Sequence, residues 1–274
     1  MPIHPTAVIA GSARIDETAH VGPYCVVGDD SAVGAGVVLQ SHVVIGDRTH
    51  IGANCRLHPF SVVGGPPQDL KYHGEPSRTI IGDGTVVREC ATVNGGTEGG
   101  IMETRVGKNC LLMTSCHVAH DCRVGDGVVM ANNATLAGHV VVGDRAVIGG
   151  LAAVHQFVRI GEYAMIGGLA GVERDVIPYG LASGDRAFLA GLNLVGLKRG
   201  GFDKKDVQSL LKAFAELFDA GEDATLKQRT AETAQRYADN PLLARIVAFM
   251  ERESERGLCR PKNGDAAGAK AKTS

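Results

Sequence analysis

The chain has 274 residues, including 37 glycines, no tryptophan and only 4% aromatic side chains. Conventional globular cores use more large rings, so small and branched aliphatic side chains must fill this core, and Val, Ile and frequent Gly favour strands joined by tight turns. A net charge of −2 argues against non-specific nucleic-acid binding, and no nucleic-acid partner is expected.

The sequence gives no sign of export or of membrane insertion. No stretch approaches the roughly 18 apolar residues that make a membrane-spanning helix. The N-terminal segment MPIHPTAVIAGSARID lacks the basic start and the long apolar run of a signal peptide. The seven cysteines form no CxxC pair, which is typical of reduced thiols rather than a disulfide framework. We therefore expect a cytoplasmic protein.

An aliphatic residue recurs at every sixth position over most of the chain. The series runs from Ile3 to Val63, resumes from Ile81 to Val93, and resumes again from Val106 to Val172 without a polar exception. Neither a helical nor a simple strand period explains this spacing. A period of six with glycine often following the aliphatic residue predicts a hexapeptide parallel β-helix, in which three hexads form one triangular coil of about 18 residues.

This solenoid is predicted over residues 1–180, and two insertions interrupt its phase. They cover about residues 64–80 and 94–105. Long loops on a regular scaffold are usually functional, because the scaffold itself does not need them. The second insertion contains the glycine-rich run NGGTEGG, but it does not lead from a strand into a helix, so it is a weak candidate for a phosphate-binding loop.

After the repeats, helical spacing predicts a C-terminal helical domain over residues 190–258 that caps the open end of the solenoid. Aliphatic and aromatic residues from Val207 to Phe218 follow helical spacing and end at Gly221. A second helix is expected over about 225–238. A third is expected to begin with Asn240 as its cap and Pro241 in the first turn, and to end near Gly257. Residues 259–274 are expected to be a disordered tail.

Candidate catalytic groups gather in CHVAHDCRVG, LAGHVVVG and AVHQF. His120, Gly138 and Gln156 are each one coil apart, so they should form a vertical column on one side of the prism. His139 and His155 adjoin this column. A neutral imidazole can act as a general base near neutral pH, a neighbouring carboxylate can orient it, and a glycine amide can donate to an oxyanion.

A lone histidine on a β-helix is usually a surface residue, but several aligned by the repeat favour a functional site. His117 and Asp121 flank His120 in the sequence and belong to the same group. By contrast, Cys116 and Cys122 have no base at a suitable spacing, and they are expected to be packing or surface thiols.

These segments closely resemble the UDP-N-acetylglucosamine O-acyltransferases that begin lipid A synthesis. The resemblance continues through QDLKYHGEPSRT and GLNLVGLKRGGF and covers roughly residues 3–260. It implies a left-handed coil and a homotrimer with sites between neighbouring prisms. It also implies transfer of a (R)-3-hydroxyacyl chain from acyl carrier protein to the 3-hydroxyl of UDP-N-acetylglucosamine, by direct attack and with no cofactor or metal.

The resemblance also implies roles for individual residues. His120 would be the general base, Asp121 its support and Gly138 the oxyanion donor. Gly168 would set acyl length, and a glycine there leaves room for a longer chain. The expected substrate-binding residues are Asp69, Lys71, His117, His139, His155, Gln156, Asn193 and Arg199.

The chain departs from the family pattern at two places. Gly200 follows Arg199 where family members often carry a second basic residue, which puts part of the nucleotide contact in doubt. Asn94-Gly95 stands where a familiar member has His-Arg. Related enzymes acylate a 3-amino group instead of the 3-hydroxyl, so the sequence leaves the acceptor atom open.

Three other functions are compatible with the repeat. One is an acetyltransferase that uses acetyl-coenzyme A, or the sibling N-acyltransferase of lipid A synthesis, although the sibling is expected to carry an N-terminal domain before its repeats. A second is a zinc enzyme like the γ-class carbonic anhydrases, with His117, His120 and His139 as ligands. A third is a non-catalytic scaffold, which predicts that His120→Ala has no effect on acyl transfer.

Overall fold

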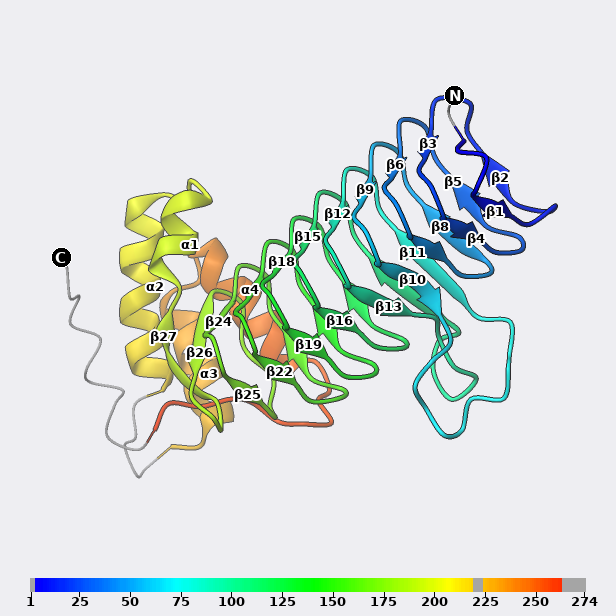
Figure 1. The fold of residues 1–274 in the computed structure, drawn as a ribbon. Coiled ribbons are helices and arrows are strands. Elements are labelled where there is room, and N and C mark those ends of the chain that lie inside the picture. The colour runs from blue at the N-terminus through cyan, green and yellow to red at the C-terminus, as the bar shows by residue number, and fades with distance from the viewer. Residues whose placement is uncertain (1–2, 219–223, 263–274) are drawn as a thin grey trace.

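The computed structural model describes residues 3–218 and 224–262. Three parallel sheets run the length of a triangular solenoid, and the helices gather at its C-terminal end (Figure 1). Sheet I comprises β1 (Val8–Ile9), β4 (Val26–Val27), β7 (Val44–Ile45), β10 (Val62–Gly65), β13 (Thr92–Asn94), β16 (His117–Val118), β19 (Thr135–Leu136), β22 (Ala153–Val154) and β25 (Gly171–Val172).

The other two sheets repeat the same short strands. Sheet II comprises β2 (Arg14–Ile15), β5 (Ala32–Val33), β8 (Thr49–Ile51), β11 (Arg78–Ile81), β14 (Glu103–Val106), β17 (Arg123–Val124), β20 (Val141–Val142) and β23 (Arg159–Ile160). Sheet III comprises β3 (His20–Val21), β6 (Val38–Leu39), β9 (Arg56–Leu57), β12 (Val86–Val87), β15 (Leu111–Leu112), β18 (Val129–Met130), β21 (Val147–Ile148), β24 (Met165–Ile166), β26 (Gly180–Ser183) and β27 (Phe188–Leu192).

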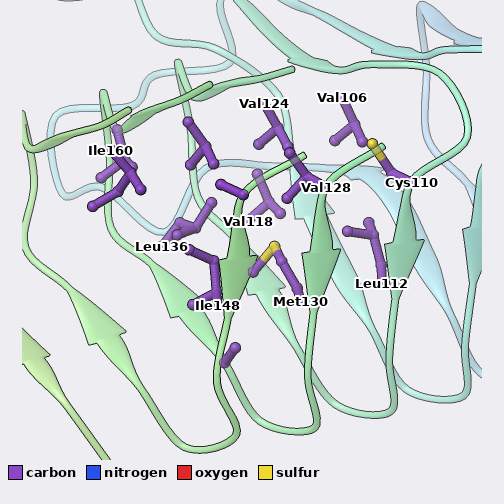
Figure 2. Packing of buried hydrophobic residues seen from close by; sticks show 14 of the residues in the cluster. Val106, Cys110, Leu112, Val118, Val124, Val128, Met130, Leu136, Ile148 and Ile160 are labelled. Carbon is purple, nitrogen blue, oxygen red and sulfur yellow. The ribbon is translucent and has the colours of Figure 1, made fainter. Parts of the chain in front are cut away.

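The hexad aliphatic residues fill the prism, as the spacing predicts. Leu112, Val118 and Met130 are fully buried and pack across successive coils (Figure 2). Burying an aliphatic side chain of this size contributes about 1.5–3 kcal/mol. The position two residues before each of these aliphatic residues is also buried and is occupied by small side chains, among them Cys110 and Cys116. Repeated aliphatic burial on every coil therefore stabilises the solenoid without large aromatic rings.

Five of the seven cysteines occupy this small inward position, which explains their irregular spacing. Several of these thiols donate a hydrogen bond to a carbonyl of the next coil, as Cys122 does to Ala137 at 3.1 Å and Cys110 does to Gly125 at 3.1 Å. All seven cysteines are free, and only Cys90 is exposed. Cys116 and Cys122 are buried packing residues, which agrees with the sequence interpretation.

The two insertions leave the solenoid and re-enter it in register. Val62 pairs with Thr92, and Thr92 pairs with His117, although these pairs are 30 and 25 positions apart rather than the 18 of a regular coil. The strands on either side reach further into the insertions than the sequence predicts, so the first loop is residues 66–77 and the second is residues 95–102. Both loops project from the same region of the prism (Figure 1).

The open end of the solenoid is covered first by a hairpin that the sequence did not reveal. β26 continues sheet III in parallel, and β27 returns antiparallel to it. Beyond the hairpin, the helices are α1 (Leu194–Arg199), α2 (Lys204–Leu217), α3 (Leu226–Arg236) and α4 (Pro241–Glu251). No helix in these described parts of the chain is long and apolar enough to cross a membrane.

The helix boundaries differ in part from those predicted. Asn240 caps α4 by accepting hydrogen bonds from the N–H groups of Leu242 and Leu243, as expected for an Asn-Pro start. However, α4 ends at Glu251 because Arg252 is extended, so the predicted end near Gly257 is wrong. α2 ends at Leu217, and the predicted stop at Gly221 lies outside the described residues.

The ordered chain extends past the predicted start of the tail. Cys259 is 2% exposed, and its N–H donates to the carbonyl of Asp175 at 2.8 Å. Leu258 also bridges to Asp175 in parallel. A disordered tail beginning at 259 is therefore wrong for residue 259 itself, because this segment adds a further backbone pairing to the last coil. The remainder of the predicted tail, from residue 263, lies outside the described residues.

Candidate active site

The predicted column lies along the edge where sheet I meets sheet II. His120, Gly138 and Gln156 occupy equivalent turns after β16, β19 and β22. Backbone hydrogen bonds join these turns, from His139 N to His120 O at 3.0 Å and from Phe157 N to Gly138 O at 3.1 Å. The regular coil height therefore places groups from three parts of the sequence in one line.

His120 and Asp121 form a hydrogen-bonded pair at this edge. His120 Nδ1 donates to Asp121 Oδ2 at 2.9 Å, and the side chains are 12% and 0% exposed respectively. Because the carboxylate accepts the Nδ1 proton, Nε2 is left as the proton-accepting nitrogen. This arrangement is that of an oriented general base.

The buried Asp121 carboxylate is held in its charged form. Burial alone raises its pKa, but hydrogen bonds from Thr97, His120 and Ile101 outweigh burial and hold the pKa below its usual range. The Thr97 hydroxyl donates to Oδ2 at 2.6 Å, and the Ile101 N–H donates to Oδ1 at 2.8 Å. A charged Asp121 stabilises an imidazolium when His120 takes a proton.

Gly138 leaves space beside the His120 ring. A β-carbon at this position would lie 2.5 Å from Cε1 and Nε2 of His120. In the described part of the chain, no carbonyl accepts the Gly138 N–H, so this N–H can donate to another group. A backbone donor next to the base has the placement that an oxyanion-binding group requires.

His139 continues the line of rings on the next coil. Its ring meets that of His120 edge-on at 5.0 Å and stacks on Phe157 at 4.4 Å with an interplanar angle of 7°. Burial lowers the pKa of His139. Burial, with His120 adding a smaller effect, also lowers the pKa of His117, whose Nδ1 bonds to Thr92 Oγ1 at 2.7 Å. Both imidazoles therefore favour the neutral form.

The first loop brings a second carboxylate to the base. Asp69 Oδ2 lies 3.9 Å from His120 Nε2, on the side of the ring opposite Asp121. The Lys71 N–H donates to Asp69 Oδ1 at 2.9 Å and shapes the loop around it, while the Lys71 side chain is exposed. The Asp69 carboxylate is thus placed beside Nε2, on the side from which a polar substrate could approach.

His155 and Gln156 lie two coils above His120, one coil above Gly138, and are exposed. His155 Nδ1 is 3.3 Å from the Gln156 carbonyl, which also accepts a hydrogen bond from Arg256 Nε at 2.8 Å. The segment after α4 therefore contacts the upper end of the column.

Three predicted residues lie elsewhere on the same chain. Asn193 caps α1, accepts from Gly196 N at 2.9 Å and donates to Tyr163 O at 2.8 Å. With Arg199 it lines a groove along the edge between sheets II and III, on a different edge from His120. Gly168 is exposed in the turn between β24 and β25, on the third edge. One chain therefore does not bring these residues to the histidine column.

One group among the described residues has donor atoms spaced closely enough for a metal ion. His120, Asp121 and His139 each offer an atom, all within 4.8 Å of one another. This set differs from the three histidines considered from the sequence, because His117 is replaced by Asp121. Both Asp121 oxygens already accept hydrogen bonds from the second loop, which suits an orienting carboxylate better than a metal ligand.

Sequence reasoning missed the partners that hold the site together. Thr97 on the second loop, Thr92 beneath His117 and Phe157 above His139 were not candidates. Phe157 could have been found, because it is 18 positions after His139 and the repeat stacks such residues. The contact of Thr97 depends on the path of a loop that breaks the repeat, and no spacing signals it.

The fold is that of a hexapeptide-repeat acyltransferase. The family described as "Udp N-acetylglucosamine O-acyltransferase; Domain 2" matches residues 175–259, and the bacterial transferase hexapeptide family matches residues 24–59 and 103–138. A Rickettsia canadensis relative named acyl-[acyl-carrier-protein]--UDP-N-acetylglucosamine O-acyltransferase is 53% identical and covers 94% of this chain and 97% of its own length. A relative of the same name from Azorhizobium caulinodans is 50% identical, with 96% of each chain covered.

Solved structures agree with these relatives. The crystal structure of a UDP-N-acetylglucosamine O-acyltransferase from Moraxella catarrhalis superposes with a TM-score of 0.91 at 42% identity, over 95% of this chain and 100% of that one. The chain belongs to the UDP-N-acetylglucosamine O-acyltransferase family. It is an acyltransferase with a left-handed β-helix and a C-terminal helical region.

Proposed function

We propose that this enzyme transfers a (R)-3-hydroxyacyl chain from acyl carrier protein to the 3-hydroxyl of UDP-N-acetylglucosamine, and so opens lipid A synthesis. The observation that supports it most directly is the 2.9 Å hydrogen bond between His120 Nδ1 and Asp121 Oδ2, next to Gly138, whose N–H has no carbonyl acceptor among the described residues. The curated relatives carry names that state O-acyl transfer from an acyl carrier protein to UDP-N-acetylglucosamine, which supports the proposal. We also propose that the enzyme works in the cytoplasm.

The proposed reaction needs a base and an oxyanion donor. His120 Nε2 takes the proton of the sugar 3-hydroxyl as the oxygen attacks the thioester carbonyl. The new C–O bond forms, and the Gly138 N–H donates to the oxygen that becomes negative. The C–S bond then breaks, and the His120 imidazolium returns its proton to the leaving thiolate. Asp121 keeps the ring oriented and stabilises its charged form.

The substrate-binding residues are assigned by their positions around this centre. Asp69, Lys71, His117 and His139 lie on the His120 edge, where they would contact the sugar and the donor. His155 and Gln156 extend the same edge by one coil.

We further propose that the active enzyme is a homotrimer. Asn193 and Arg199 line a groove on another edge of the prism, which would face the His120 edge of a neighbouring protomer. Gly200 follows Arg199, so the proposed nucleotide contact relies on one cation at this place.

The test is to identify the product by mass spectrometry. UDP-N-acetylglucosamine is incubated with a mixture of (R)-3-hydroxyacyl carrier proteins, and in parallel with acetyl-coenzyme A. We expect one hydroxyacyl group on the sugar, bound as an ester that mild alkali releases. An alkali-stable amide, or product from acetyl-coenzyme A alone, would overturn the proposal.

A mixing experiment tests the shared site. His120→Ala and Arg199→Ala are each expected to be nearly inactive, because each removes one half of every site. Co-assembled trimers of the two variants contain some sites with both halves intact, so activity should return. If mixed trimers of verified composition stay inactive, the two residues do not serve one site across protomers.

A further inference from the structure

The second loop closes around the carboxylate of Asp121. The Thr97 hydroxyl donates to Asp121 Oδ2 at 2.6 Å, the Thr97 N–H to the same oxygen at 3.1 Å, and the Ile101 N–H to Oδ1 at 2.8 Å. The Asp121 side chain is fully buried. A buried carboxylate is costly unless its oxygens find donors, and residues 95–102 supply most of them here.

The glycines of this loop permit the close approach. A β-carbon on Gly100 would overlap the carboxylate of Asp121, and one on Gly96 would overlap the backbone at Met102 and Glu103. The run NGGTEGG therefore forms a loop that surrounds an anionic side chain of the same chain, the carboxylate of Asp121.

One oxygen of Asp121 links this loop to the base. Oδ2 accepts from both Thr97 Oγ1 and His120 Nδ1. The position of Oδ2, and with it the angle of the imidazole, therefore depends on the threonine hydroxyl. We infer that residues 95–102 act as a carboxylate clamp in which Thr97 is the positioning residue for His120. This inference rests on the proposed function, because it assigns His120 as the base.

Hydrogen bonds from the clamp, and from Asn94 just before it, also connect it to the first loop. Asn94 Nδ2 donates to Pro66 O at 2.8 Å, and the Glu98 N–H donates to Glu75 Oε1 at 3.1 Å. The first loop carries Asp69 to within 3.9 Å of His120 Nε2. The two loops therefore lie side by side (Figure 1), and two carboxylates lie on the two nitrogen sides of the His120 ring, with Asp121 bonded to Nδ1 and Asp69 3.9 Å from Nε2.

The test compares three variants of the full-length enzyme with UDP-N-acetylglucosamine and a hydroxyacyl carrier protein. Thr97→Val removes the hydroxyl donor but keeps the branched shape and the N–H. We expect kcat to fall about 10- to 100-fold, as for loss of a hydrogen bond to an ionised group, with KM for the sugar nucleotide within about twofold of wild type. Thr97→Ser retains the hydroxyl and should restore most of kcat.

Thr85→Val is the matched control. Thr85 is also fully buried and donates to a backbone carbonyl, Gly107 O at 2.8 Å, but it lies away from the column. Its kcat should match wild type even if its melting temperature falls. If Thr97→Val does not fold, Thr97→Ala, whose side chain is smaller, also removes the hydroxyl and should show the same fall in kcat.

The outcomes separate the two levels of inference. Wild-type enzyme that transfers no acyl group contradicts the proposed function itself. Active wild type with Thr97→Val or Thr97→Ala at near-normal kcat overturns the clamp while leaving the function intact. A rise in KM equal to the loss in kcat/KM, with kcat unchanged, would equally overturn it, because the loop would then serve binding rather than the base.

Discussion

Gly138 lies against the imidazole of His120, so that a β-carbon on the glycine would be 2.5 Å from both Cε1 and Nε2 of the ring. The two residues are one coil apart, and their turns are joined by the hydrogen bond from His139 N to His120 O. The absence of a side chain at 138 therefore serves two purposes. It leaves space beside Nε2 of the base, and it lets the backbone of residue 138 lie close to the ring.

Gly138→Ala is expected to lower kcat about 100-fold, because the new methyl group displaces the ring by a sizeable fraction of an ångström and blocks Nε2. Gly138 does not have a left-handed backbone, so alanine should not strain the turn itself. Steady-state kinetics and a thermal melt measure the two effects separately. Gly11→Ala is the control, since nothing lies within 4 Å of a β-carbon there. Normal kcat in Gly138→Ala would contradict the assigned geometry.

His120→Ala is expected to keep the assembly state of the wild type, which we propose to be a trimer, and to lose about 10²- to 10⁴-fold in kcat, the contribution of a positioned general base. Only part of the imidazole is solvent-exposed, and its removal leaves the aliphatic core untouched. Analytical ultracentrifugation checks the assembly, and single-turnover kinetics check the chemical step. Near-normal turnover in this variant would show that His120 is not the base.

The repeat made the solenoid and the histidine column predictable from the sequence. Each coil is fixed by strand pairing at constant register, so a spacing of 18 converts directly into neighbours in space, as for His120 and Gly138. The start of helix α4 was also predictable, because Asn240 and Pro241 are residues that favour the first turn of a helix.

The sequence did not predict contacts made by segments that break the repeat. Thr97 reaches Asp121 across 24 positions, and Asp69 reaches His120 through a loop of irregular backbone. Neither path follows from periodicity. The hairpin of β26 and β27 was missed for a related reason: it forms to pair the free edge of sheet III, and its sequence carries little alternation of its own. The conformation of the two loops and of the hairpin is determined by tertiary contacts rather than by local propensity.

Gly168 should permit a long acyl chain. It is exposed, and a β-carbon there would meet only Gly150 O, at 3.4 Å. In an assay with a ladder of hydroxyacyl donors we expect a preference for chains longer than about ten carbons, and Gly168→Met should shift the optimum to shorter chains, since one methylene changes discrimination by about 10-fold or more. Val38→Met, on the outer face of sheet III far from this turn, is the control. A strong preference for about ten carbons in the wild type would reject this role.

Mild acid should destabilise the folded protein through two half-buried histidines. Burial lowers the pKa of His117 and of His139, so the unfolded chain binds protons at a higher pH than the folded one. Their contribution to stability is full above the unfolded value near 6.5 and is lost as pH falls below it. The melting temperature should drop between about pH 7 and 5.5, before carboxylates titrate. His117→Gln should flatten this slope, whereas His73→Gln, at an exposed site, should not.

The cysteines should differ sharply in their reactivity toward iodoacetamide. Burial raises the pKa of Cys116 and of Cys122 to about 12, so neither thiol ionises appreciably near neutral pH, and neither is accessible. The thiolate is the species that alkylates, and both access and ionisation are needed. Cys90 is exposed. We expect one carbamidomethyl group per native chain, on Cys90, with activity retained; Cys90→Ser should take up none until urea is added. Labelling of Cys116 or Cys122 before Cys90 would mean that the solenoid opens between coils under native conditions, because no other route leads a reagent to these inward positions.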